Sequence, residues 1–231
     1  MLFDLISAIQ TGSAESLRWA FASLLLSLPI ILLALCVHET AHGYVANKLG
    51  DPTASSMGRL TLNPIKHLDP LGFICMLCFG FGWAKPVPVN SRYFKKPRRD
   101  MAICAAAGPI SNVLLAFIFA GLLKIFYIST ASVMLSSQMS YNLIMFAEIL
   151  LILGIRLNVT LAVFNLLPIP PLDGSKILYI FLPQRILFKV LQYERYIYFG
   201  LLALLFVGVL DIPLNFLSGL ILNLISLIFG L

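Results

Sequence analysis

Apolar segments long enough to cross a membrane constrain the fold of this chain more than any other feature. A helix needs about 20 mostly apolar residues to span the hydrocarbon core of a bilayer. Of the 231 residues, 60% are hydrophobic and only 11% are charged, whereas about a quarter of a soluble domain is charged. We therefore expect one all-α polytopic membrane domain over residues 1–231. About five spans are expected, at 19–46, 101–127, 141–167, 196–210 and 213–231.

The positive charges gather in two of the segments between these spans. Of the 16 Lys and Arg residues, nine lie in 48–100 and four lie in 171–195. The positive-inside rule assigns both segments to the cytoplasm. Residues 1–18 contain neither a basic region nor a small-residue cleavage site, so we expect a mature tail rather than a signal peptide. The sequence thus predicts a multi-pass protein of the cell (plasma) membrane, with its N-terminus outside and its C-terminus inside.

Residues 50–100 are the least helix-like part of the chain. The segments 58–63 and 86–90 are typical of short extended pieces. Between them, residues 71–83 are apolar but too few to span. Non-helical backbone is tolerated at membrane depth only beside protein or a watery cavity. We therefore expect a re-entrant segment or a short β-hairpin that lines a cavity between the first two spans.

An HExxH pattern lies at the inner end of the first expected span, as His38-Glu39-Thr-Ala-His42. Residues four apart share one face of a helix, so His38 and His42 can hold one metal ion. Glu39 is then beside the metal, where it can take a proton from a water molecule. A polar cluster at membrane depth is costly unless it has a function. The pattern therefore predicts one catalytic Zn²⁺ per chain, with the active site toward the cytoplasmic side.

A catalytic zinc has three protein ligands and an open fourth position. Asp173 is the stronger candidate for the third ligand, because the prolines of 168–171 must unwind the backbone just before it, at the same depth. Asp173 as a helix N-cap is the structural alternative. His67 is the only other histidine, and we expect it at the cytoplasmic surface.

Polar residues inside the second and third spans need partners. Asn112 follows the small residues around Gly108 and Pro109, which allow close helix contact. It is expected to face protein, either as glue between helices or near the metal. Glu148 and Arg156 on the third span are expected to form a buried structural pair.

Three motifs carry a family resemblance in their joint order. They are HETAH at the end of the first span, GPISN in the second and NLLPIPPLDG after the third. Together they resemble the site-2 protease family of intramembrane zinc metalloproteases. The segments 58–64 and 82–90 resemble the minimal subgroup, which lacks PDZ and CBS domains. The resemblance covers 36–175 and implies a three-helix catalytic core at about 19–175, followed by accessory helices at about 176–231.

The same resemblance implies roles for individual residues. His38, His42 and Asp173 are implied as zinc ligands, and Glu39 as the general acid and base. Asn165 matches the family asparagine eight residues before the aspartate, and it could donate a hydrogen bond to the developing oxyanion. Structural or substrate-contacting roles are expected for Asn112, Gly108, Pro109, Arg59 and Trp83.

The implied activity is hydrolysis of peptide bonds within or next to transmembrane segments of membrane-protein substrates or remnant signal peptides. A substrate helix would have to unwind, and it would then pair with 57–62 or 86–90 as an added strand. The basic segments are expected to meet anionic lipid headgroups rather than nucleic acid, because no recognition motif accompanies them. A transporter using Glu148 and Arg156 and a structural zinc scaffold closed by a fourth ligand are the alternative classes of function.

Overall fold

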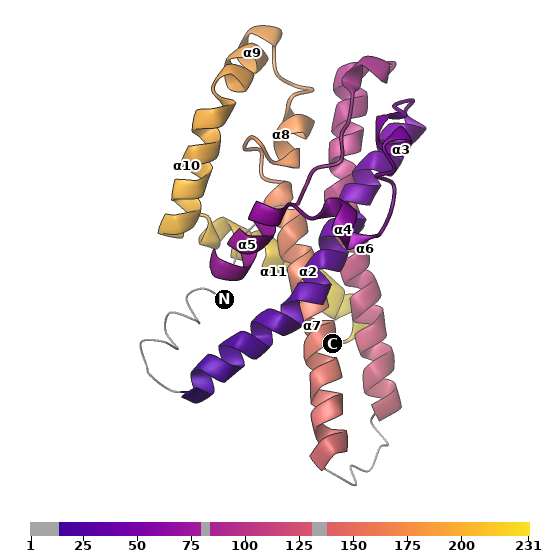
Figure 1. Ribbon diagram of the computed structural model, residues 1–231, viewed down its shortest axis with the longest axis vertical. Coiled ribbons are helices and arrows are strands. Elements are labelled where there is room, and N and C mark those ends of the chain that lie inside the picture. The colour runs from indigo at the N-terminus through magenta and orange to yellow at the C-terminus, as the bar shows by residue number, and fades with distance from the viewer. Residues whose placement is uncertain (1–13, 80–83, 131–137) are drawn as a thin grey trace.

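Three long helices form the centre of the molecule (Figure 1). The computed structural model describes residues 14–79, 84–130 and 138–231. The central helices are α2 (Ala14–Lys48), α6 (Pro97–Thr130) and α7 (Gln138–Asn165). They cover the first three expected spans, except that α7 ends at Asn165, just before the prolines.

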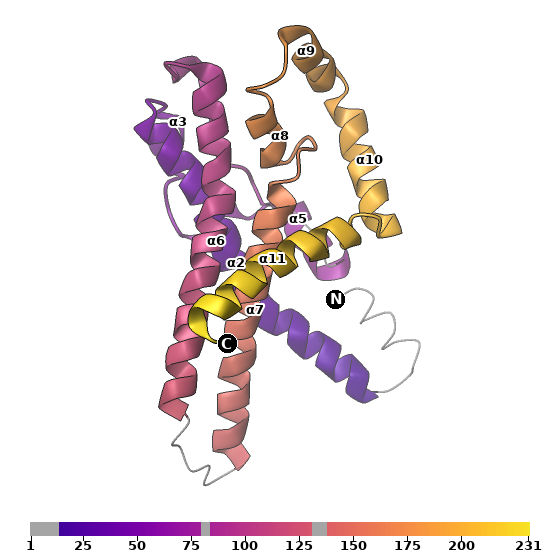
Figure 2. The same cartoon turned by 180° about the vertical axis from the view of Figure 1, so that it is seen from behind.

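Helices α6 and α7 lie side by side, and α2 crosses them obliquely (Figures 1 and 2). Small residues allow this close packing, since Ala116 on α6 is completely buried and a Cβ on Gly154 of α7 would lie 2.6 Å from the ring of Phe119. Ile30 of α2 and Val159 of α7 belong to the same buried cluster. The crossing therefore forms the core of the fold, and it holds the C-terminal half of α2 against α6.

The segment between α2 and α6 contains short helices joined by irregular backbone. They are α3 (Thr53–Ser56), α4 (Pro64–His67), α5 (Pro70–Phe79) and the 3-10 turn η1 (Ser91–Tyr93). α5, with 10 residues, is too short to span a bilayer. In the described part of this segment, strand-like pairing is limited to one antiparallel bridge between Leu68 and Ala84. The fuller β-hairpin stays a prediction.

Four helices follow the central three. They are α8 (Asp173–Leu178), α9 (Gln184–Gln192), α10 (Glu194–Val207) and α11 (Asp211–Phe229). α11 crosses α6 and α7 on the side of the molecule that faces the viewer in Figure 2. Among the described residues, four helices are long and apolar enough to cross a membrane, or five if α9 and α10, which meet at a bend of 65°, count as one span. The expectation of about five spans agrees with that range.

The expected buried pair on α7 is wrong. Arg156 is exposed, and Glu148 accepts a hydrogen bond from the Tyr127 hydroxyl of α6 at 2.7 Å. The partner of Glu148 comes from a neighbouring helix, which the spacing of charges along a single helix cannot reveal.

Candidate metal centre

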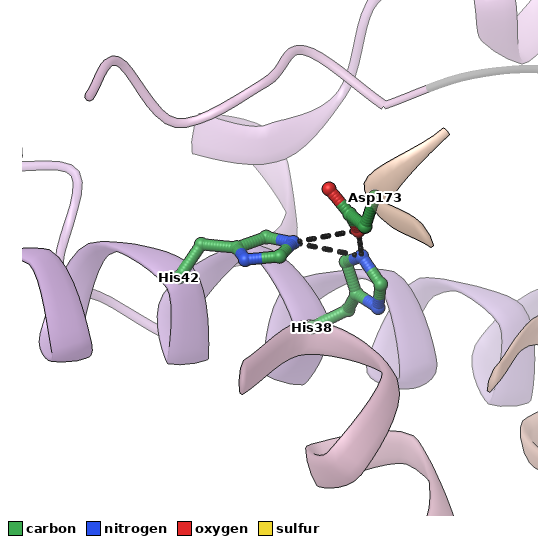
Figure 3. A group of neighbouring side chains, drawn as sticks. All are labelled: His38, His42 and Asp173. Atoms are coloured by element: carbon green, nitrogen blue, oxygen red, sulfur yellow. Dashed lines mark hydrogen bonds and ion pairs between the residues drawn. The ribbon is translucent and has the colours of Figure 1, made fainter. Parts of the chain in front are cut away.

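Three ligand atoms from two distant parts of the chain converge near the C-terminal end of α2 (Figure 3). The Nε2 atoms of His38 and His42 are 3.0 Å apart. Each lies 3.1 Å from Oδ2 of Asp173, the first residue of α8. All three side chains are buried. The structure therefore brings together the two histidines of the HExxH pattern and the stronger candidate for the third ligand.

The chain after α7 folds back sharply to deliver Asp173. Proline cannot continue a helix, and Pro168, Pro170 and Pro171 follow the end of α7 directly. Gly174 then lies against the end of α7, where a Cβ would collide with the carbonyl group of Leu166. Only glycine fits here, so the Asp-Gly pair places a carboxylate on tightly folded backbone beside α2.

The outer nitrogens of both imidazoles donate hydrogen bonds to protein oxygens. Nδ1 of His38 donates to Oδ1 of Asn112 at 2.6 Å, and Nδ1 of His42 donates to the carbonyl of Cys104 at 2.7 Å. A neutral imidazole has one donor and one acceptor nitrogen, so both Nε2 atoms present lone pairs to the carboxylate of Asp173. Metal-bound histidines are commonly oriented by such outer partners.

This donor set fits a zinc ion. Three electron-rich atoms within 3.1 Å of one another need a cation among them. Zinc bonds of about 2.0–2.1 Å in a tetrahedron correspond to ligand atoms roughly 3.3 Å apart, close to the observed spacing. Gly108 of α6 leaves the necessary room, since a Cβ there would lie 2.6 Å from Nε2 of His38 and would collide with Nε2 of His42.

A cavity of about 360 Å³ opens beside the three ligand atoms. Glu39, Asn165 and Lys176 contribute polar side chains to its lining. Oε2 of Glu39 accepts a hydrogen bond from the backbone N–H of Val87 at 2.7 Å. Asn165 donates one amide hydrogen to the carbonyl of Leu161 at 2.9 Å, which leaves the second hydrogen of that amide for another acceptor. The cavity is thus lined by the ligand cluster (His38, His42 and Asp173), by the carboxylate of Glu39 and by the amide of Asn165.

The remaining predicted residues lie at different distances from this cavity. Gly108 and Asn112 contact the histidines, whereas Pro109 is buried in α6. Arg59 is buried, and its Nη2 donates to the carbonyls of Lys85 at 2.7 Å and Pro86 at 3.2 Å. Trp83 lies outside the described residues.

His67 is buried rather than at the surface, which corrects the expectation for it. Its Nε2 donates to the carbonyl of Thr61 at 2.7 Å, and its own carbonyl accepts from the N–H of Lys85 at 2.8 Å. These tertiary contacts fold its segment inward. His67 therefore braces the loop instead of joining the ligand cluster.

Two contributors to the site are not among the residues predicted from the sequence. Lys176 lies one helical turn after Asp173, and its Nζ is 3.1 Å from Oδ1 of that carboxylate. The spacing of three residues on a helix could have indicated this pair. The second contributor is the Cys104 carbonyl, which belongs to the main chain and therefore cannot be predicted from the type of residue.

The amino-acid sequence is similar to those of known proteins. The model of peptidase family M50 matches residues 26–208. The Bacillus subtilis "Putative zinc metalloprotease YwhC" is 46% identical over 166 residues, which cover 72% of this chain and 73% of that protein. The Mycolicibacterium smegmatis "Putative zinc metalloprotease Rip2" is 30% identical over 75% of this chain and 67% of its own length. A Methanocaldococcus jannaschii protein with the same description, MJ0611, is 36% identical over 61% of this chain and 62% of its own. No solved structure matches the chain.

Proposed function

The chain belongs to peptidase family M50, the site-2 protease family of zinc metalloproteases, and we propose that it cleaves peptide bonds within or next to transmembrane segments of other membrane proteins. The observation that carries this proposal is the cavity at the inner end of α2, where a ligand cluster and a carboxylate meet between apolar helices. We propose membrane-tethered regulators or remnant signal peptides as its substrates.

We assign the zinc ligands as His38, His42 and Asp173. When bound, zinc lowers the pKa of a coordinated water toward ~7 and polarises a peptide carbonyl. Glu39 then acts as general base and receives the proton of the attacking water. It returns a proton to the leaving amine as general acid. The hydrogen bond from Val87 to Oε2 keeps this carboxylate turned toward the cavity.

Asn165 is proposed as a donor to the oxyanion that forms on the substrate carbonyl. It lines the same cavity, and one hydrogen of its amide is already fixed on Leu161. Loss of one oxyanion donor typically costs on the order of 10²–10³ in rate. Asn165→Leu is therefore expected to reduce cleavage by about that factor while zinc stays bound.

The substrate is proposed to unwind and to pair with the irregular backbone beside the cavity. Within 86–90, the N–H groups of Val87 and Asn90 are engaged by Glu39 and Asp51. Proline has no N–H, so within 86–90 the N–H of Val89 is the donor that an added strand would use. Val89→Pro should therefore reduce cleavage with unchanged zinc content, and equal cleavage would remove this segment from consideration.

We further propose one domain over residues 1–231, with the catalytic core at about 19–175. We place it in the plasma membrane with the N-terminus outside and the cavity toward the cytoplasm. Support comes from the concentration of Lys and Arg in 48–100 and 171–195. Labelling of single introduced cysteines with a membrane-impermeant reagent tests this orientation.

Glu39→Gln tests the proposed function directly. If the protein is a protease of this mechanism, the variant should keep stoichiometric zinc, and its cleavage of a model membrane substrate should fall by about 10²–10⁴-fold. Glu148→Gln is the matched control, since Glu148 bonds Tyr127 on α6 and does not line the cavity. A zinc scaffold or a transporter would show no Glu39-dependent cleavage, and persistent cleavage in Glu39→Gln would disprove the assigned mechanism.

A further inference from the structure

A line of buried amides connects α7 to the ligand cluster through α6. Asn112 of α6 and Asn158 of α7 are both 0% exposed. Nδ2 of Asn112 donates to Oδ1 of Asn158 at 2.9 Å. Burying polar side chains at this depth is costly unless they are hydrogen-bonded, so these hydrogen bonds offset the cost of burying the two amides.

The direction of every hydrogen bond in this line is fixed by main-chain acceptors. Nδ2 of Asn158 donates to the carbonyl of Gly154 at 2.8 Å, which turns its Oδ1 toward Asn112. Nδ2 of Asn112 also donates to the carbonyl of Ala34 on α2 at 3.2 Å. With both hydrogens used, the Oδ1 of Asn112 must face Nδ1 of His38, 2.6 Å away.

The hydrogen bond at Nδ1 also determines the state of Nε2 on the other side of the His38 ring. An oxygen opposite Nδ1 requires the hydrogen of the neutral imidazole on Nδ1. Nε2 then carries the lone pair, and this atom faces His42 and Asp173. A flipped Asn112 amide would place N–H groups opposite Nδ1 and would favour the tautomer with its hydrogen on Nε2. That tautomer cannot bind a cation in the cluster.

We propose that Asn158 is a positioning residue, which fixes the tautomer and ring orientation of His38 through Asn112. The proposal rests on the proposed function only in taking His38 as a zinc ligand. Asn158 lies outside the HExxH, GPISN and NLLPIPPLDG motifs. The competing role is a purely structural hydrogen bond between α6 and α7, which would affect stability alone.

The test uses the full-length protein in lipid nanodiscs and two substitutions of Asn158. Asn158→Leu keeps the approximate volume and removes both hydrogen bonds. Asn158→Thr can still bond the Gly154 carbonyl, as threonine does in helices, but its hydroxyl ends too short for Asn112. Zinc affinity is measured by chelator competition, and the tautomer of His38 by ¹⁵N spectroscopy of labelled histidine in the zinc-free state.

We expect zinc affinity to fall about tenfold in both variants, the lower end of the usual 10–100-fold range for outer partners of metal ligands. The ¹⁵N signal of His38 should shift toward the tautomer with its hydrogen on Nε2. Asn158→Asp is the rescue variant, because a buried neutral carboxylic acid donates to Gly154 and accepts from Asn112. Its zinc affinity should lie closer to that of the parent protein.

Val159→Ala is the matched control, since Val159 is the next residue of α7 and is fully buried in the core. It should lower the unfolding temperature without changing zinc affinity or the His38 tautomer. If both Asn158 variants behave like Val159→Ala, or if the threonine variant keeps the Nδ1–H tautomer, the proposal is overturned. Neither readout involves peptide cleavage, so a protein that binds zinc and cleaves nothing would refute the proposed function and leave this inference standing.

Discussion

On one wall of the cavity His38 and His42 are held by packed helices, whereas on the other Glu39 meets backbone of irregular structure. On the helical wall, the outer nitrogen of each histidine is bonded to an oxygen of α6. On the loop wall, the contact to Glu39 is the N–H of Val87, which lies between Pro86 and Pro88. The two walls meet at adjacent residues of α2, yet they depend on different kinds of structure.

The loop wall is fixed by a few individual contacts. Gly43 allows Leu60 and Val87 to lie directly on α2, because a Cβ there would be 2.6 Å and 2.9 Å from their side chains. The Thr40 hydroxyl of α2 donates to the Thr61 carbonyl at 2.8 Å. Arg59 bonds two successive carbonyls of the facing segment.

The contrast agrees with the roles proposed for the two walls. Metal ligands must stay in place to a fraction of an ångström, and helices with satisfied side chains provide that rigidity. A wall that accepts an unwound peptide needs backbone whose own groups can be rearranged, and regular helices have none to offer. Substitutions on the helical wall should therefore affect zinc binding, and those on the loop wall should affect cleavage.

Gly108→Ala is expected to have the largest effect. Its Cβ would occupy the space between the two imidazoles, and the helices cannot separate without disturbing the core. We expect at least roughly 100-fold weaker zinc binding, the upper end for disturbed metal surroundings. Metal content of the purified protein, measured by mass spectrometry, tests this expectation.

Gly219→Ala is the control for this substitution, because a Cβ on Gly219 in α11 meets nothing within 4 Å. It should bind zinc normally. Normal zinc binding by Gly108→Ala would mean that the helical wall is far more adaptable than its packing implies.

Arg59→Met should have an intermediate effect confined to the loop wall. It removes charge-assisted hydrogen bonds, which contribute about 1.5–3 kcal/mol, and releases the segment that carries Val87. We expect cleavage to fall about tenfold with zinc content unchanged. Arg92→Met is the control, since Arg92 is exposed in the same region. A parallel loss of zinc and activity in Arg59→Met would contradict the division into two walls.

Asp51→Asn should have the smallest effect, on stability and its pH dependence. Burial would raise the pKa of the Asp51 carboxyl, but hydrogen bonds from the Thr53 side chain and from the backbone of Asn90 and Thr53 hold it below its usual range. A carboxyl with a lowered folded-state pKa stabilises the fold above its unfolded pKa of about 3.9, and this contribution is lost as the pH falls through the folded value. The variant should be about 1–2 kcal/mol less stable at pH 7.

Thermal unfolding of both proteins from pH 7 down to pH 3 measures this difference. The gap in stability should begin to narrow below about pH 4, where the Asp51 carboxyl of the unfolded parent chain takes up a proton while that of the folded protein is still ionised. A gap that stays constant across the range would show that the Asp51 charge does not hold the loop wall in place.

The parts of the molecule that could be predicted from sequence are those encoded locally. Hydropathy is sufficient for α2, α6 and α7, because a membrane span must satisfy its backbone internally. A spacing of four places His38 and His42 on one helical face. The prolines before Asp173 mark the point where the backbone has to leave α7.

The parts that could not be predicted depend on tertiary partners. His67 was expected at the surface, but contacts with Thr61 and Lys85 bury it. The positions of Glu148 and Arg156 on one helix predict a pair between them, yet Glu148 accepts a hydrogen bond from Tyr127 of α6. For Asn112 the sequence left two roles open, and the structure shows that one side chain does both, bonding His38 and joining three helices.

The cavity beside the three ligand atoms can supply water, which is a reactant in peptide hydrolysis. Each peptide bond that is hydrolysed consumes a water molecule, and hydrocarbon contains almost none. A cavity of about 360 Å³ is large enough to hold several water molecules beside the ligand atoms. Lys176 and Asn165 provide polar groups that can retain them. If water already occupies the cavity when a substrate arrives, hydration of the site is not a slow step. Entry and unwinding of the substrate are then the expected slow steps.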